Sequence, residues 1–165
     1  MAVTYEPIAT YTVPSAQASY TFTSISQAYT DLVLVVSGSN SSGDSQISIQ
    51  VGNGSVNTGT VYSTTFMYGN GTSAASSRDS TQSWAHVARL DTTLGNSIIQ
   101  FMNYSNTTTY KTILGRGNDA TLTMATVSLV RDTVATNTIK LQANDAGSIN
   151  FTTGTTFTLY GIKAA

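Results

Sequence analysis

The sequence predicts an all-β protein: an antiparallel β-sandwich of the jelly-roll kind, folded as a single domain over residues 1–165. Threonine, serine and asparagine are abundant, with 29, 21 and 11 copies, and β-branched threonine suits a half-exposed pleated surface. Apolar residues recur with a period of two, whereas no window holds an apolar helical stripe over three turns. A chain of 165 residues is long enough to bury a sizeable core in one domain.

The alternation of apolar and polar residues is clearest at Ile47, Ile49 and Val51. Many short strands separated by turn signals are typical of a sandwich. A β-helix is the alternative, but the sequence lacks the fixed repeat period that it requires. We expect about eleven strands, over residues 4–13, 19–25, 31–37, 45–51, 60–68, 83–90, 97–104, 109–114, 121–130, 137–142 and 155–162.

One expected strand lacks the alternation. Residues 32–36 read Leu-Val-Leu-Val-Val without a polar residue. A strand that is apolar at every position is typically covered on both faces. We therefore expect this strand either at the centre of a sheet or beneath a neighbouring subunit.

Turn chemistry supports the same fold. The dipeptides Asn53-Gly54 and Asn70-Gly71 supply the positive φ angles that tight hairpins need. Further loops or turns are expected at 38–43, 116–119 and 144–147. The stretch 69–83 is small, polar and unpatterned, so we expect it to be the longest loop.

Charge is scarce and balanced. Charged residues make up 9% of the chain, with seven Lys+Arg against eight Asp+Glu and a net charge of -1. This leaves no electrostatic footprint for nucleic acid or an anionic membrane. It also leaves weak charge repulsion between copies, which suits a subunit of an assembly.

Targeting and redox signals are equally sparse. The sequence has no cysteine, which excludes disulfides, thiolate chemistry and cysteine-based metal sites. The longest apolar run, 32–36, is far short of the ~20 residues of a membrane helix. The first residues lack a basic segment followed by an apolar run, as a signal peptide would have. We expect a soluble protein made in the cytoplasm, with no membrane insertion.

Few side chains could act in acid–base catalysis, since the chain holds one histidine and one glutamate. His86 is the one base that a serine or threonine nucleophile could use. Alternation places Trp84, His86 and Ala88 on one strand face, where we expect a histidine satisfied by an ordinary hydrogen bond. No G-x-S-x-G elbow is present. We predict a non-enzymatic protein without catalytic residues, and we expect turn roles for the aspartates beside turn signals, namely Asp31, Asp44, Asp119 and Asp145.

Cofactor and metal motifs are also missing from the sequence. There is no calcium-loop motif and no second histidine, so we expect no metal. The glycine-rich stretches 52–54 and 69–72 have no following lysine or helix, so hairpins explain them better than a phosphate cradle. We expect no cofactor. Asn-x-Ser/Thr triplets arise by chance in so Ser/Thr-rich a chain, and they begin at Asn40, Asn53, Asn70, Asn103, Asn106 and Asn150.

Aromatic residues are the remaining candidates for a binding surface. Tyr62, Tyr68 and Tyr104 lie near expected strand ends or loops, where an amphipathic ring can contact a partner such as a sugar or a receptor. Core and interface packing is the alternative for the same rings, and it is the more frequent role.

Three segments together resemble a family of small virion structural proteins of tailed phages, especially marine and cyanobacterial ones. The first is 29–38, which opens with Tyr-Thr-Asp-Leu. The second is 99–111, with Tyr104, Asn106 and Lys111. The third is 149–162, with Gly154, Phe157 and a closing Leu-Tyr-Gly-Ile.

The resemblance implies a non-enzymatic role on the exterior of a virion, after synthesis in the cytoplasm of the bacterial host. We expect a capsid decoration, cement or knob protein, because the chain shows neither coiled-coil heptads nor a repetitive shaft. A tail-fibre or tail-tip subunit that binds a receptor glycan is the alternative. The implied partners are the major capsid protein or the tail and baseplate proteins of the same virion, with a host surface glycan in the second case. A homotrimer is implied by analogy, and the family offers no functional residues to transfer.

Overall fold

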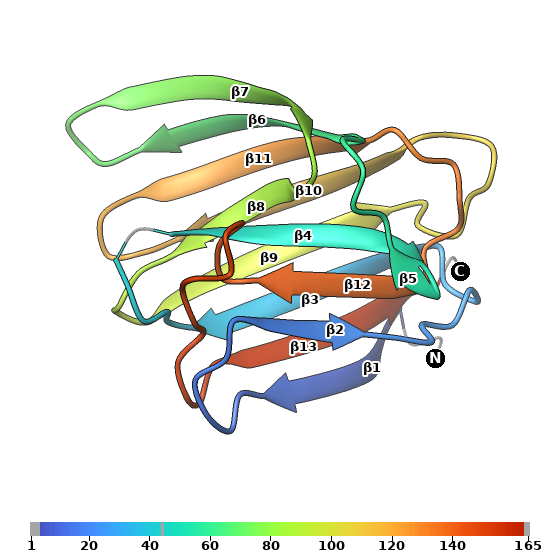
Figure 1. The fold of residues 1–165 in the computed structure, drawn as a ribbon, viewed down its shortest axis with the longest axis horizontal. Helices are drawn as coiled ribbons and strands as arrows, with labels where there is room; N and C mark the ends of the chain where they lie inside the picture. Colours follow the sequence, from blue (N-terminus) through green and yellow to red (C-terminus); the bar gives the residue numbers. More distant parts are fainter. Residues whose placement is uncertain (1–3, 44, 164–165) are drawn as a thin grey trace.

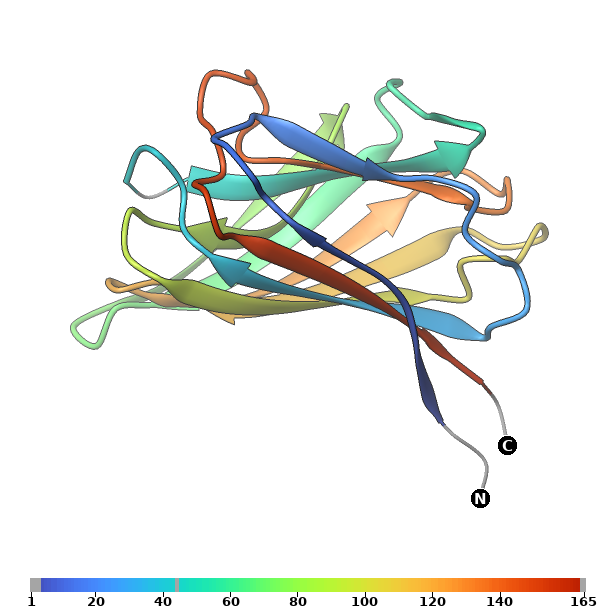
Figure 2. The same ribbon diagram turned by 90° about the horizontal axis from the view of Figure 1, so that it is seen from below.

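Two antiparallel β-sheets, stacked face to face, make up the protein (Figures 1 and 2). The structure is a computed structural model that describes residues 4–43 and 45–163, so Asp44, for which a turn role was expected, lies outside the described residues. These residues form thirteen strands and no helix. The predicted all-β antiparallel sandwich is confirmed.

The larger sheet has eight strands and the smaller has five. The larger sheet runs in the spatial order β1 (Tyr5–Thr12), β13 (Thr156–Ile162), β3 (Asp31–Gly38), β9 (Gly95–Met102), β10 (Lys111–Asn118), β11 (Thr123–Val130), β6 (Tyr62–Gly69) and β7 (Ala74–Gln82). The smaller sheet runs β2 (Ser19–Phe22), β12 (Thr138–Gln142), β4 (Ser45–Asn53) and β5 (Ser55–Val56), and β8 (Ala85–Leu90) also pairs with β4.

The chain passes repeatedly from one sheet to the other. Strands β1, β3, β9 and β13 of the larger sheet connect directly to β2, β4, β8 and β12 of the smaller one. Strands β10, β11, β6 and β7 continue the larger sheet past β9. Strand β8 packs over β10 and β11, and the β6–β7 hairpin lies beyond it (Figure 1).

Alternating side chains from both sheets fill one core. Phe157 and Leu159 of β13 point inward between half-buried neighbours, and Ile47 and Ile49 of β4 are fully buried as well. Fully burying such a side chain stabilises the fold by roughly 1.5–3 kcal/mol. The apolar residues whose period of two predicted these strands are therefore the ones whose burial holds the two sheets together.

The uninterrupted apolar strand lies in the middle of the larger sheet. β3 pairs with β13 on one edge and β9 on the other, as its composition predicted. Leu32 and Leu34 are fully buried in the core, while Val33 is 7% exposed on the opposite face and Val35 is half-buried there. The outer face of this strand is thus apolar as well.

The expected long loop at 69–83 is wrong. Asn70-Gly71 does form the predicted turn, with a φ of 87° at Gly71, but residues 74–82 then form β7. Almost every residue of β7 is exposed, because the strand pairs with β6 along one edge and no second sheet covers it. Because β7 buries no apolar face, its sequence shows no alternation of apolar and polar residues.

Two smaller expectations also fail. The turn expected at 116–119 begins later, because Gly117 and Asn118 still pair with β11. Trp84, His86 and Ala88 do not share a face in an unbroken strand. The register of β8 against β4 shifts, so that His86 pairs with Ser48 and Ala88 pairs with Ile47. This β-bulge turns His86 away from the core.

Candidate functional site

The free edge of β8 is closed by hydroxyl groups. One edge of β8 pairs with β4, and the other meets the inner surface of the larger sheet. The hydroxyl of Thr126 donates to the Val87 carbonyl at 3.0 Å, the hydroxyl of Ser128 donates to the His86 carbonyl at 3.4 Å, and the His86 amide donates to Thr64 Oγ1 at 3.3 Å. We call Thr64, Thr126 and Ser128 the hydroxyl seam. Buried backbone groups need partners, and here side chains provide what a neighbouring strand would.

The seam depends on a glycine in the facing strand. A Cβ atom at Gly115 of β10 would lie 1.8 Å from the Val87 carbonyl oxygen and 2.5 Å from Thr126 Oγ1. Glycine is therefore the one residue that lets the larger sheet approach the edge of β8 this closely.

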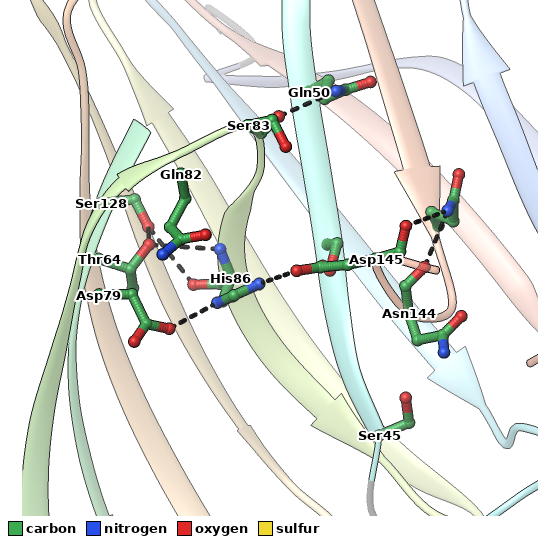
Figure 3. Close-up of polar contacts among 12 residues, drawn as sticks. Ser45, Gln50, Thr64, Asp79, Gln82, Ser83, His86, Ser128, Asn144 and Asp145 are labelled. Carbon is green, nitrogen blue, oxygen red and sulfur yellow. Dashed lines mark hydrogen bonds and ion pairs between the residues drawn. The ribbon is translucent and has the colours of Figure 1, made fainter. Parts of the chain in front are cut away.

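His86 lies at this closed edge, between two carboxylates (Figure 3). Its Nε2 is 2.7 Å from Asp145 Oδ2, and its Nδ1 is 3.1 Å from Asp79 Oδ2. His86 is 6% exposed, and its ring stacks on Phe66, with the centroids 5.7 Å apart. Asp79 lies seven residues before His86 on the preceding strand, whereas Asp145 lies 59 residues after it, so two consecutive strands and a distant loop meet at one imidazole. We call His86, Asp79 and Asp145 the histidine clamp.

Asp145 is held in place from both sides. It lies in the loop between β12 and β13, and the hydroxyl of Ser48 on β4 donates to its second carboxylate oxygen. The Gln142 side-chain amide donates to the carbonyls of Asn144 and Asp145, which fixes the loop. The expected turn role of this aspartate is therefore wrong, because its carboxylate bonds the clamp. Asp119 does behave as expected, accepting the Thr121 and Leu122 amides.

The electrostatics favour a charged imidazole. Burial disfavours the cation, but the contacts with Asp145 and then Asp79 outweigh it and raise the pKa of His86 above its ordinary value of 6.5. Burial also acts to raise the pKa of Asp145, yet the hydrogen bonds from His86 and Ser48 lower it overall. An imidazolium can donate to two carboxylates at once, whereas a neutral ring has one N–H.

This geometry does not activate a nucleophile. A catalytic histidine must take the proton of a hydroxyl through a ring nitrogen, and both ring nitrogens of His86 already face carboxylates. Thr64 and Ser128 contact the main chain of His86, while Ser48 contacts Asp145. Within residues 4–43 and 45–163, no group of three or more His, Cys, Asp or Glu side chains is placed to hold a metal ion.

The structure separates the three tyrosines suggested by the sequence. Tyr62 is fully buried: its hydroxyl accepts the Val51 amide at 3.0 Å, and burial raises its pKa to about 12. Tyr104 is 1% exposed and its hydroxyl donates to the Ser26 carbonyl. Neither ring reaches the surface, so we do not retain these two as contact residues. Tyr68 is half-buried beside Met67 and Ala75 at the tip of the β6–β7 hairpin, and its contact role stays a prediction.

Two of the Asn-x-Thr triplets have a structural explanation. Asn106 Oδ1 accepts the backbone amides and the hydroxyls of Thr108 and Thr109. Asn70 Oδ1 does the same with Thr72 and Ser73. These side chains close Asx turns, which accounts for the repeated spacing more directly than chance does.

Sequence reasoning missed the outer face of the larger sheet. Cross-strand pairing aligns Met67, Ala125, Arg116, Ile98 and Val35 in one row over β6, β11, β10, β9 and β3. Thr65, Val127, Leu114 and Gln100 form the next row. Met67 is 56% exposed, Val127 47% and Ile98 40%. We call these two rows the outer face. The sequence indicates this face where two consecutive residues of a strand are both apolar, as in Ile98-Ile99, because consecutive side chains point to opposite faces of a sheet.

The charges of the outer face are cationic. Arg116 lies within the first row, and Arg78 of β7 pairs across from Thr65 beside the second. Both side chains are exposed, and neither meets a carboxylate among residues 4–43 and 45–163. Asp31, at the start of β3, already accepts the Asn103 amide and the Gln100 side chain. The outer face is therefore apolar with unneutralised positive charge.

No family model matches the chain, and no curated protein matches it. Among the described residues, no helix has the length and apolar character to cross a membrane.

Proposed function

We propose that the protein is a non-enzymatic structural subunit on the exterior of a tailed-phage particle, namely a capsid decoration, cement or knob protein. The observation that carries the proposal is the outer face of the larger sheet. Apolar side chains that are 40–56% exposed lie there in adjacent rows, and contiguous exposed apolar surface marks interaction sites. The sequence resemblance to small virion structural proteins supports the same role.

The topology gives further support. Strands β1, β13, β3 and β9 lie side by side in one sheet, and β2, β12, β4 and β8 do so in the other. Jelly rolls have eight strands in two sheets and two Greek keys. We propose that these eight strands form a jelly roll, in which β6–β7 and β10–β11 are added hairpins.

The charge of the outer face indicates the kind of partner. Neither Arg78 nor Arg116 forms an ion pair with a carboxylate of residues 4–43 and 45–163, so a partner surface should be apolar and carry carboxylates. Two copies meeting outer face to outer face would bring these arginines together. We therefore propose that this face meets a different virion protein, and that a homotrimer would form through another surface.

Binding to isolated particles tests the proposal. Shells and tails of the parent phage, stripped of this protein, are mixed with the purified chain and sedimented. We expect saturable binding to shells, and Val127→Asp should abolish it by placing a carboxylate in the outer face. Val134→Asp is the matched control, because Val134 is 49% exposed but lies in the segment between β11 and β12.

Two results would contradict the proposal. Equal binding by the Val127 and Val134 variants would show that the outer face is not used. Binding to tails or to host surface glycan, with none to shells, would favour the tail-tip alternative.

A further inference from the structure

The histidine clamp connects the β6–β7 hairpin to the sandwich. The hairpin contributes Met67 and Arg78 to the outer face or its border, and β7 is the last strand of the larger sheet. Backbone pairing with β6 holds β7 on one side (Figure 1). The contact between Asp79 and His86 joins it to β8 and so to the smaller sheet (Figure 3).

The clamp acts where the hairpin is irregular. The pairing of β7 with β6 shifts register between Tyr62 and Thr64, which pair with Gln82 and Asp79. Thr81, within this shift, has a φ of 59°, a conformation that β-branched residues rarely adopt. Such strain persists only where surrounding contacts over-determine it. Asp79 makes its contact with His86 two residues before Thr81.

Loss of one proton must break one of the two contacts. A neutral imidazole has one N–H and one lone pair, so it cannot donate to both carboxylates. The Nε2 contact with Asp145 is shorter, at 2.7 Å, and Ser48 also fixes that carboxylate. The Nδ1 contact with Asp79 is longer, at 3.1 Å. The remaining proton therefore stays on Nε2, and the lone pair on Nδ1 faces Asp79.

We propose that His86 is a pH-dependent latch, which holds the β6–β7 hairpin against the sandwich while protonated and releases it at Asp79 when the proton leaves. The charged groups that face the ring are Asp79 from β7 and Asp145 from the β12–β13 loop. Phe66 stacks on the ring, Thr64 and Ser128 bond the main chain of His86, and Ser48 bonds Asp145. None of these four side chains titrates in this range. The role in docking rests on the proposed function, because the hairpin forms part of the outer face.

The latch can be tested on the purified protein by NMR. His86 is the only histidine, so its imidazole signal is unambiguous. We expect its titration midpoint above 6.5 in the wild type and a lower midpoint in Asp79→Asn. Amide exchange in β7, corrected for intrinsic pH dependence, should accelerate as the pH passes the wild-type midpoint. The acceleration should be about tenfold for each unit by which the midpoint is raised.

A matched control removes a different acid from an edge strand. Glu6 of β1 pairs with Lys163 at 2.7 Å at the opposite edge of the same sheet. Glu6→Gln should leave both the His86 midpoint and the exchange of β7 unchanged, whereas Asp79→Asn should show fast β7 exchange at every pH.

A His86 midpoint at or below 6.5, or β7 exchange that is the same in the wild type and Asp79→Asn, would overturn the latch. These readouts need no particle, so they are independent of shell binding. A pH-dependent hairpin in a protein that fails to bind shells would leave the latch standing and refute the proposed function. Shell binding by a protein whose hairpin does not respond to pH would support the proposed function and refute the latch.

Discussion

Gly115 is the position at which a single methyl group should do the most damage. In Gly115→Ala, the new Cβ would lie 1.8 Å from the Val87 carbonyl oxygen and 2.5 Å from Thr126 Oγ1. Real Cβ atoms do not approach a backbone oxygen so closely, and the Val87 carbonyl carbon is also only 2.7 Å away, so the obstacle is main chain that no rotation of a side chain can move. Strand β8 must therefore move away from β10.

The free-energy change can be worked from the contacts that this movement breaks. Separation removes the 3.0 Å hydrogen bond from Thr126 to Val87, which is worth about 1 kcal/mol. The strain of overpacking adds roughly 1–3 kcal/mol. We expect Gly115→Ala to lower the free energy of unfolding by about 3 kcal/mol, which in a chain of this length lowers Tm by roughly 6–12 °C.

Calorimetry with a matched control measures this effect. Gly69→Ala makes the same substitution in β6, where the nearest neighbour of the added Cβ is the Ser73 carbonyl oxygen at 3.6 Å, an ordinary contact. Its Tm should stay near that of the wild type. A Gly115→Ala protein that melts with the wild type would refute the close approach of β8 and β10, and with it the hydroxyl seam.

The remaining predictions concern buried hydroxyls, turns and pH. Tyr62→Phe leaves the Val51 amide without its partner and should lower the unfolding free energy by about 1–3 kcal/mol in urea titration; an unchanged urea midpoint would contradict this. Because the pKa of Tyr62 is raised to about 12, the stability it contributes is present below pH 10 and is lost as the pH rises towards 12, by roughly 2.7 kcal/mol; Tyr62→Phe should lack this alkaline slope. The pKa of Asp145 is lowered instead, so the stability that its carboxylate contributes is present above the ordinary pKa of an aspartate and is lost as the pH falls further. Urea titrations of Asp145→Asn should lack this loss of stability in acid. Asn106→Ala removes the acceptor of an Asx turn and should lower the unfolding free energy by about 1 kcal/mol in the same assay.

The fold could be predicted where side chains carry the signal. The alternation of apolar and polar residues in β4 and β13 and the apolar run of β3 identified strands that are held by packing. Strand β7 was missed because almost all of its side chains are exposed and it buries no apolar face. The bulge in β8 was missed because a local alternation cannot show a register shift that the partner strand imposes.

The candidate site was predictable in part. His86 was expected to be a satisfied strand histidine, and its ring does have partners. One partner, Asp79, is on β7, and the other, Asp145, is in a loop 59 residues away. The chain must cross between the two sheets before Asp145 reaches His86, and the local sequence does not show this. The outer face was missed for a related reason. It is made of single exposed residues on separate strands, and only the sheet order reveals that they are neighbours.

A cryo-EM reconstruction of the phage particle that carries this protein would test the central claim most directly. We predict many copies on the head, with strands β9, β10 and β11 turned towards the shell and Ile98 and Val127 buried against another virion protein. A reconstruction in which this face is open to solvent, or in which the protein is absent from the particle, would contradict the account.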